Sequence, residues 1–418
     1  RAIGTAEGHT LMLSFGDDRM ANGFVLERYT EGLVFENDRK FEVANKQIVL
    51  KVFMADSMLY WICATKIKRS AIKVIVHSVS ASLIGDISVT EIGTYNTGDI
   101  DIDQFEVASS PDKRRWVILG FGTAGQRTRE ALGTEVWMLR ADVDGGEARS
   151  SFILTSERWS PADLTWKSVV LDDSGKVFAI YEDKDYGGTG LLGGHKQLNH
   201  FHWVKSGGDS LMRGDLVVEG DVLDAVAVLH TKTQALQVFG YYNAGKGVGM
   251  DGYFIGEFGD DGQIATSNHP FTESAAKQFM GLGSLKRNER PDNYYIRNVV
   301  ALSNGGWLML SEQFYESRQM ETYYVNGVPQ TSSKLFYHYG DIAMQYLQKD
   351  GTLDSLIMVR KTQVGAVNVA HLFGFGMYVC GSSINLLYND DEGEINRIMH
   401  VKIDKSFKVE RDWLFRNE

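Results

Sequence analysis

One pattern recurs six times along the 418 residues: a short apolar strand, a tight polar turn, and a second strand rich in aromatic and β-branched residues. We expect the second strands to begin near Met58, Trp116, Val177, Leu236, Trp307 and Met377. Their spacing of about 60 to 70 residues leaves room for four strands in each interval. Because a repeat buries its apolar face against the next repeat, such a chain forms one core by addition rather than several separate domains.

The clearest copy shows what each repeat contains. Its four strands are expected at Ala225–His230, Ala235–Tyr242, Asp251–Phe258 and Gln263–Asn268. A four-stranded antiparallel sheet that repeats around an axis is the blade of a β-propeller.

A seventh set of strands opens the chain and begins at Thr10, Gly23 and Phe41. It lacks an innermost strand, which residues 1–8 or a segment outside this chain would supply. We therefore predict an all-β, seven-bladed β-propeller of four-stranded antiparallel blades that forms a single domain over residues 1–418. Two packed sandwich domains are the structural alternative.

Helix signals are confined to one segment, PFTESAAKQFMGLG. Thr272 can cap a two-turn helix that ends before Gly281. We predict a short helical insertion between blades near residues 272–281.

Charge and cysteine content exclude several classes of protein. The formal charge of −11 argues against broad binding to nucleic acid, where a basic face supplies most of the affinity. No apolar run reaches the roughly 18 residues of a transmembrane helix. Cys63 and Cys380 lie in apolar segments and are expected to be buried free thiols, although a pairing of the two stays open.

Two motifs resemble catalytic signatures. GFGTAG at 120–125 matches a dinucleotide fingerprint, but the following QRTREAL has almost no apolar face with which a helix could pack on a sheet. GGDSLMRG contains a serine, Ser210, for which the sequence offers no evident base. We therefore expect no catalytic residues and no cofactor.

Three histidines are the best candidates for a metal site. His200 and His202 are two residues apart and would share one face of a strand, and His195 could join them from a nearby loop. A further ligand or catalytic carboxylate cannot be assigned, and Trp203 indicates a half-buried aromatic strand instead. We expect no metal-dependent chemistry here.

The connections between second and third strands are long, and in an up-and-down blade they emerge on one face, where recognition loops commonly lie. The segment 316–335 contains Arg318, Tyr323 and Tyr324, and the segment 183–198 contains Tyr186 and His195. Arginine and tyrosine dominate the energetics of protein interfaces. We predict that these five residues contact a partner.

Three segments carry a resemblance to a family. DGYFIGEFGDDGQI from Asp251, HYGDIAMQYLQKDGTLDSL from His338 and LLYNDDEGEI from Leu386 together resemble exported β-propeller-like proteins of unknown function from Gram-negative bacterial cell envelopes. The resemblance covers the C-terminal half. It implies an exported protein that is periplasmic or associated with the outer membrane.

We interpret the chain as a non-enzymatic protein-binding or scaffold module of a bacterial cell-envelope assembly. The alternative is a glycan-binding or glycan-hydrolysing propeller, which would use aromatic rings for sugar stacking and, for hydrolysis, a pair of carboxylates. The sequence assigns no such pair.

Overall fold

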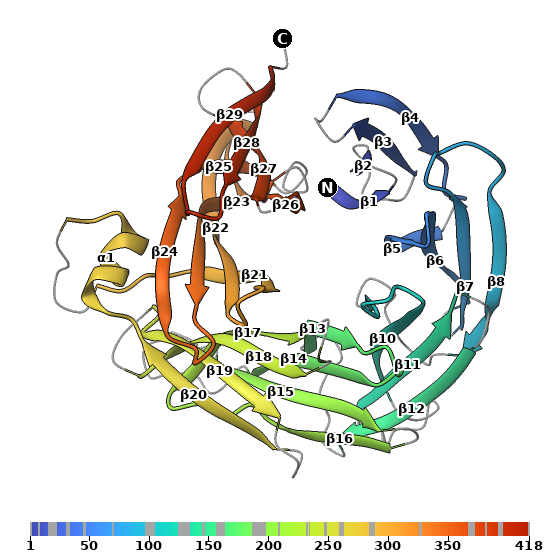
Figure 1. Ribbon diagram of the computed structural model, residues 1–418, viewed down its shortest axis with the longest axis horizontal. Coiled ribbons are helices and arrows are strands. Elements are labelled where there is room, and N and C mark those ends of the chain that lie inside the picture. Colours follow the sequence, from blue (N-terminus) through green and yellow to red (C-terminus); the bar gives the residue numbers. More distant parts are fainter. Residues whose placement is uncertain are drawn as a thin grey trace. The chain divides into compact units, whose positions relative to one another are not determined.

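A computed structural model gives the fold. It describes residues 2–416 apart from 7–8, 16–22, 31–33, 45–46, 69–70, 97–104, 124–133, 144–146, 156–163, 186–197, 208–209, 231–232, 234, 246–248, 259–262, 284–288, 326–327, 367–372, 381–382 and 392–395. Seven sheets follow one another along the chain, and within each sheet every strand pairs with the next strand in the sequence (Figure 1). The pairings are antiparallel wherever their register is described.

We number the sheets as blades 1 to 7. The first three blades are built as follows. Blade 1 contains β1 (Ala2–Ala6), β2 (His9–Phe15), β3 (Phe24–Thr30) and β4 (Phe35–Phe41); blade 2 contains β5 (Gln47–Ala55), β6 (Met58–Lys68), β7 (Ala71–Ser80) and β8 (Ser88–Asn96). Blade 3 contains β9 (Glu106–Ser109), β10 (Arg115–Thr123), β11 (Thr134–Asp142) and β12 (Glu147–Thr155).

The remaining four blades complete the set. Blade 4 contains β13 (Leu164–Leu171), β14 (Val177–Asp185), β15 (Leu198–Gly207) and β16 (Ser210–Asp215); blade 5 contains β17 (Asp221–Leu229), β18 (Leu236–Asn243), β19 (Gly252–Phe258) and β20 (Ile264–Pro270). Blade 6 contains β21 (Tyr294–Ala301), β22 (Trp307–Val325), β23 (Val328–Leu347) and β24 (Leu353–Val359), with β25 (Gln363–Ala366) added beside β23. Blade 7 contains β26 (Gly376–Cys380), β27 (Ser383–Asp391), β28 (Asn396–Ile403) and β29 (Val409–Arg416).

The fold class is thus confirmed: the chain is an all-β protein with the seven four-stranded antiparallel blades of a β-propeller, one of which carries an extra strand. It divides into two compact units. One comprises Ile3–Gly245 and Tyr253–Asn268, and the other comprises Arg1–Ala2, Lys246–Gly252 and His269–Glu418. Blades 6 and 7 belong to the second unit, and the single domain over 1–418 stays a prediction.

The hydrophobic core lies between consecutive blades within a unit. In β10 the side chains of Trp116 and Ile118 pack toward blade 2, whereas Val117, Leu119 and Phe121 pack toward blade 4. Because successive side chains of a strand point to opposite faces, a blade covered on both faces needs an uninterrupted apolar run. Complete burial of each such side chain contributes about 1.5–3 kcal/mol.

The helix lies where the sequence predicts it. Helix α1 covers Glu273–Met280, and the Thr272 side chain accepts a hydrogen bond from the Ala275 amide at 3.2 Å. Gly281 ends it at φ 65°, in the left-handed region that favours glycine.

Two strand assignments made from the sequence need correction. In blade 1, β1 supplies the missing strand from within residues 1–8, which was one of the two expected sources, but β4 ends at Phe41 instead of beginning there, because the Phe41 ring stacks on Phe24 at 5.1 Å within the core. In the last repeat, the strand at Met377 is β26, which is the first strand of blade 7 and not its second.

The first strands of four blades share an irregularity. Strands β5, β13, β17 and β21 each contain a β-bulge, at Leu50, Lys167, Leu223 and Arg297 respectively. A bulge adds one unpaired residue and redirects its side chain. Two of these four residues are cationic, and both pair with a buried glutamate.

Candidate functional site

Blade 6 contains a buried cluster of charged groups. Glu312 on β22 and Lys361, in the connection from β24 to β25, have side chains that are 2% and 0% exposed. Lys361 Nζ lies 2.7 Å from Glu312 Oε1 and donates to Gln363 Oε1 at 2.7 Å. From β21, the Arg297 Nε donates to Glu312 Oε2 at 3.0 Å. One carboxylate is therefore shared by two cations.

Burial sets the protonation behaviour of this cluster. It lowers the pKa of the Lys361 ammonium, and the nearby Glu312 carboxylate partly opposes that effect. The ammonium also faces the rings of Tyr339 and Tyr388, at 5.7 Å and 5.9 Å from their centroids. The Lys361 and Glu312 side chains are almost completely buried, and their ion pair holds the β24–β25 connection against β22.

The same arrangement occurs in blade 4. There Lys167, the bulge residue of β13, places its Nζ 3.0 Å from Glu182 Oε2 on β14. In each blade the cationic residue lies two positions after the residue that pairs with the glutamate. Sequence reasoning missed both pairs. The signal was available, since Glu182 and Glu312 each follow the start of an apolar second strand by five residues.

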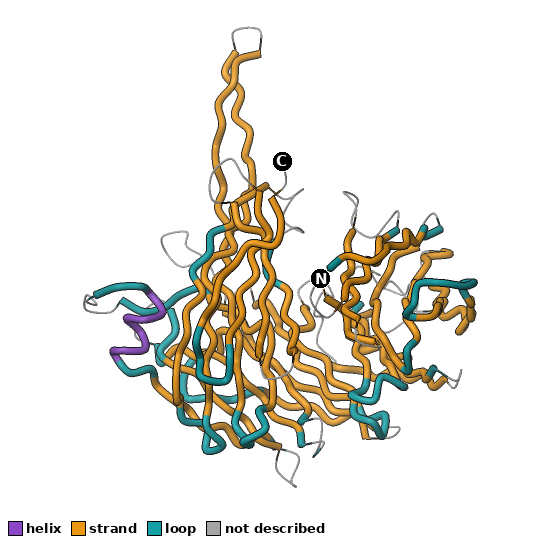
Figure 2. The backbone as a smooth tube through the Cα atoms, turned by 45° about the horizontal axis from the view of Figure 1, so that its top comes forward, coloured by secondary structure: helices purple, strands orange, loops and turns teal. Residues whose placement is uncertain are grey.

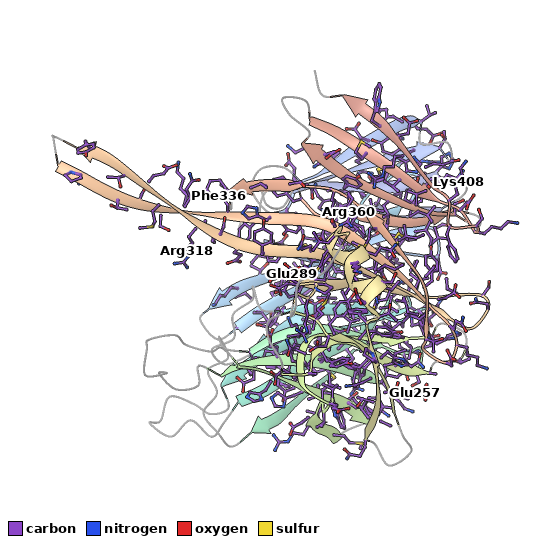
Figure 3. All side chains as sticks on the ribbon, turned by 90° about the vertical axis from the view of Figure 1, so that its left-hand side faces the viewer. Glu257, Glu289, Arg318, Phe336, Arg360 and Lys408 are labelled. Atoms are coloured by element: carbon purple, nitrogen blue, oxygen red, sulfur yellow. The ribbon has the colours of Figure 1, made fainter. Side chains whose placement is uncertain are left out.

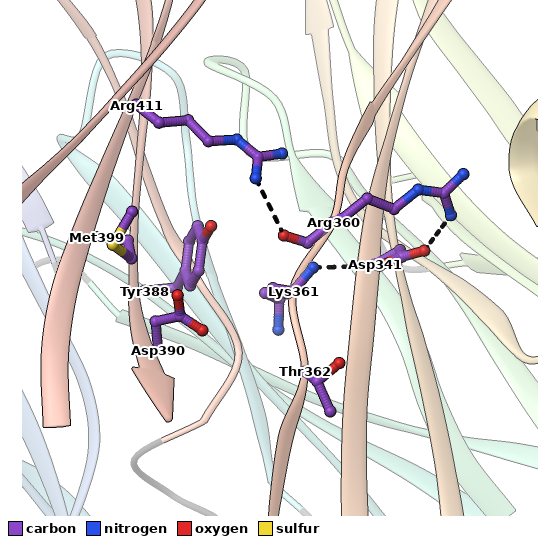
Figure 4. A pocket seen from close by; sticks show the side chains of 8 residues that line it. All are labelled: Asp341, Arg360, Lys361, Thr362, Tyr388, Asp390, Met399 and Arg411. Atoms are coloured by element: carbon purple, nitrogen blue, oxygen red, sulfur yellow. Dashed lines mark hydrogen bonds and ion pairs between the residues drawn. The ribbon is translucent and has the colours of Figure 1, made fainter. Parts of the chain in front are cut away.

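A pocket of about 350 Å³ opens beside the buried cluster, within the unit formed by blades 6 and 7 (Figure 4). One wall comes from β23 and the β24–β25 connection, and the other from β27, β28 and β29. The lining residues are Asp341, Arg360, Lys361, Thr362, Tyr388, Asp390, Met399 and Arg411.

The first wall is held by hydrogen bonds to Arg360. Its guanidinium pairs with Asp341 and donates to the carbonyl groups of Gln278 at 2.7 Å and Phe279 at 3.1 Å, at the C-terminal end of α1. The Lys361 amide donates to Asp341 Oδ1 at 3.1 Å. The helical insertion therefore fixes the wall of the pocket, although it contributes no lining residue itself.

Arg411 crosses from the second wall toward the first. Its Nη1 lies 3.5 Å from the Arg360 carbonyl oxygen, at the long end of hydrogen-bond distances (Figure 4). In the described part of the chain no carboxylate pairs with Arg411. A guanidinium has five N–H donors, so most of its capacity is available to a ligand. The pocket is therefore lined mainly by charged and polar side chains.

Blade 6 also carries a long two-stranded arm. Strands β22 and β23 are 19 and 20 residues long and stay paired out to Val325 opposite Val328. Figure 2 shows this ribbon continuing beyond the other strands of its sheet, and Figure 3 labels Arg318 and Phe336 on it. We define residues 317–335 as the arm. The prediction of a loop over 316–335 is wrong, because all but two of these residues belong to the paired strands.

Side chains on both strands join the arm to the blade. The rings of Tyr315 and His338 stack at 4.3 Å, and a hydrogen bond of 2.7 Å joins Ser317 Oγ to His338 Nε2. Phe314 packs against Tyr337 and Tyr339 at ring distances of 5.8 Å and 4.9 Å. These contacts join β22 and β23 at the base of the arm.

Beyond this base the arm has no third strand. Strand β21 pairs with β22 only as far as Gln313, and β25 pairs with β23 only from Phe336 to Tyr339. On one face of the arm Met320 is 66% exposed and Tyr324 is 73% exposed. Single exposed apolar residues are ordinary. Here, however, Arg318, Met320 and Tyr324 are separated by even numbers of residues, so their side chains lie on the same face of β22.

The five residues predicted to contact a partner have different outcomes. Arg318 and Tyr324 lie on the arm and are exposed, and Tyr323 is in β22 opposite Gln330. Tyr186 and His195 lie outside the described residues. The structure thus brings three of the five to one element, and their role stays a prediction.

The remaining candidates lie in blade 4 and in the core. His200 is exposed on β15, and His202 Nδ1 is 2.8 Å from Asp215 Oδ1. Among the described residues no three His, Cys, Asp or Glu side chains are grouped so that they could hold a metal ion. Cys63 is a buried free thiol, and burial raises its pKa to about 12.

The described part of the nucleotide-like motif forms an antiparallel strand. Residues 120–123 belong to β10, which pairs with β9 and β11, whereas a dinucleotide site needs a parallel strand followed by a helix.

No helix in the described part of the chain has the length and apolar character needed to span a membrane.

Comparisons with known proteins find likeness only among solved structures. No family model and no curated protein matches the sequence. A protein of unknown function from Dyadobacter fermentans is 11% identical with a TM-score of 0.36, over 98% of this chain and 95% of that one. Trypanosoma rangeli sialidase is 10% identical with a TM-score of 0.36, over 97% of this chain but 59% of the sialidase. Synechocystis apocarotenoid oxygenase is 8% identical with a TM-score of 0.39, over 86% and 74%. At these values no activity is transferred to this chain.

Proposed function

We propose that the protein is a non-enzymatic binding module that holds a protein partner on its arm. The partner contributes an extended segment, which adds as a strand to the outer edge of β22. The observation that carries this proposal is the unpaired edge: from Tyr315 to Val325, no strand in the described structure pairs with the side of β22 that faces away from β23. A row of unpaired backbone N–H and C=O groups is a template for an added strand.

The two edges of the arm are not equivalent. The outer edge of β23 contains Pro329 and Lys334, and proline and lysine are residues that natural proteins use to prevent pairing at an edge. The β22 edge contains neither residue from Tyr315 to Val325. This asymmetry supports β22 as the docking edge.

Side chains define the chemistry of the partner segment. Arg318, Met320 and Tyr324 share one face of β22 and are exposed, so an added strand would place its own side chains beside them. A carboxylate beside Arg318 and apolar residues beside Met320 and Tyr324 are the complementary groups. A two-stranded ribbon is marginally stable alone, and a third strand would stabilise it.

We further propose that this interaction belongs to an assembly of the bacterial cell envelope and that the protein is exported. The support is the resemblance of the C-terminal segments to exported β-propeller-like proteins. Cell fractionation tests the location: the protein should be in the periplasmic or outer-membrane fraction, and recovery in the cytoplasm would contradict the proposal.

Backbone geometry supplies a matched pair of variants. The Phe314 amide donates to the Asn293 carbonyl on the β21 side, so the amides of alternate residues, including Thr322, point toward the same outer edge. Thr322 pairs with Thr331 on β23, whose amide then points toward the opposite edge. Proline at either position removes one outward amide and keeps the hydrogen bonds within the arm.

We expect Thr322→Pro to abolish co-purification of the partner from native envelopes, and Thr331→Pro to retain it. Melting temperatures of both variants should match that of the unchanged protein. Retained binding by Thr322→Pro, or equal loss in both variants, would contradict docking at the β22 edge.

A further inference from the structure

The pocket between the two walls of blades 6 and 7 has a ligand chemistry of its own, separate from the arm. Its volume of about 350 Å³ is within the range of small-molecule sites. Three cationic side chains, Arg360, Lys361 and Arg411, and two carboxylates, Asp341 and Asp390, line it. The formal charges of these five lining side chains sum to one positive charge.

The layer behind the pocket does not change this balance. Lys361 is in contact with Glu312, and Glu312 is also paired with Arg297, so this layer adds one negative and one positive charge. The Arg360 guanidinium forms an ion pair with Asp341 and donates hydrogen bonds to two carbonyl groups of α1. The excess positive charge is therefore available at Arg411, the lining cation for which the described residues provide no carboxylate.

We propose that this pocket binds a sugar acid: a small ligand with one carboxylate and several hydroxyl groups. Arg411 pairs with the ligand carboxylate, since a guanidinium matches a carboxylate with two parallel hydrogen bonds. Asp390 accepts hydrogen bonds from ligand hydroxyls, and the hydroxyl groups of Thr362 and Tyr388 can donate or accept. Met399 supplies an apolar surface for the carbon face of the ring.

Other small polar ligands fit this lining less well. Phosphate carries close to two negative charges near pH 7 and has few donors, so two lining carboxylates would repel it. A free amino acid has no net charge and would leave the excess positive charge uncompensated. A neutral sugar would leave the Arg411 guanidinium without its anionic partner.

Isothermal titration calorimetry of the full chain tests this assignment with glucuronate as the probe. We expect saturable binding of glucuronate, and binding of glucose or inorganic phosphate that is at least about tenfold weaker, as the loss of one charge-assisted hydrogen bond predicts. The methyl glycoside of glucuronate represents the end of a glycan chain. Equal binding of the glycoside and free glucuronate assigns a chain end as ligand, and exclusion of the glycoside assigns the free sugar acid.

Two arginine variants separate this site from the arm. Arg411→Gln should weaken glucuronate binding at least about tenfold with an unchanged melting temperature, because its side chain is exposed. Arg318→Gln, an exposed arginine on the arm, should leave glucuronate binding unchanged. Absence of glucuronate binding, equal binding of glucose, or unchanged affinity in Arg411→Gln would overturn the assignment. None of these results bears on partner binding by the arm.

Discussion

Glu312 shows how a single buried carboxylate can organise a site. It lies between Arg297 and Lys361, at 3.0 Å and 2.7 Å, and its side chain is 2% exposed. A buried ion pair adds little net stability over an apolar pair, but removing one partner leaves the other charge buried and uncompensated. Loss of the Glu312 carboxylate would therefore leave the buried Lys361 ammonium without its counter-charge.

We expect Glu312→Gln to lower the free energy of unfolding by about 3–5 kcal/mol, because Lys361 and Arg297 lose their shared counter-charge. Urea unfolding followed by tryptophan fluorescence measures this. The matched control is Glu410→Gln, which breaks the exposed pair with Lys408 and should leave stability unchanged within error. Equal effects of the two substitutions would show that the buried cluster carries no special stability.

The same variant has a defined dependence on pH. Burial holds the pKa of Lys361 in the folded protein below its ordinary value of 10.5, so between these two values the unfolded state binds more protons and stability rises with pH. Without the Glu312 carboxylate, the pKa of Lys361 in the folded protein falls further. The pH range over which stability rises with pH therefore extends to lower pH. The stability deficit of Glu312→Gln should therefore narrow as the pH rises toward 10.5. A constant or growing deficit would contradict this account of Lys361.

At the scale of single residues, the sequence also indicated one of the buried charged positions, which the patterns of apolar residues and turns do not reveal. Aligning the second strands of the repeats places Glu182 and Glu312 at one position, which marks them as residues with a shared structural role. Lys361 has no such signal, because its pairing with Glu312 joins a connection to a strand 49 positions earlier. Long-range pairs of this kind depend on packing that periodicity does not encode.

The arm is the element on which the proposed function depends. The segment was predicted to be a loop because it was interpreted as one of the long connections between second and third strands. A turn signal was nevertheless present, since Asn326-Gly327 stands between two strand-forming runs, and Asn-Gly is the strongest short hairpin signal. The length of the arm is set by the pairing of β22 with β23, which continues from the core of the blade to Val325 opposite Val328.

We expect the blade to fold without its arm. Replacing residues 317–335 by Asn-Gly keeps the Phe314 and Tyr339 contacts and the pairing of β25, and no described side chain between Ser317 and Leu335 is buried. Scanning calorimetry should give a melting temperature close to that of the unchanged protein, while partner binding is lost. A fall as large as that of Glu312→Gln would make the arm structural.

For the whole molecule, the repeated strand, turn and strand pattern was sufficient to predict seven blades. The reason is local: each blade joins strands that are consecutive in sequence, so the hairpin turns and apolar runs determine the topology. Sites formed by residues far apart in the sequence could not be predicted from this local pattern. The pocket joins residues from Asp341 to Arg411 across five strands and connections, and no motif links them.

Residue-resolved amide hydrogen exchange on the full chain, with and without the co-purified partner, tests strand addition at the β22 edge most directly. Thr322, Met320 and Arg318 point their amides toward this edge, and Thr331 and Ser333 point theirs toward the other. We predict that the partner slows exchange at Arg318, Met320 and Thr322 and leaves Thr331 and Ser333 unchanged. Unchanged exchange at the three β22 amides, or slower exchange at Thr331 and Ser333 alone, would contradict the proposal.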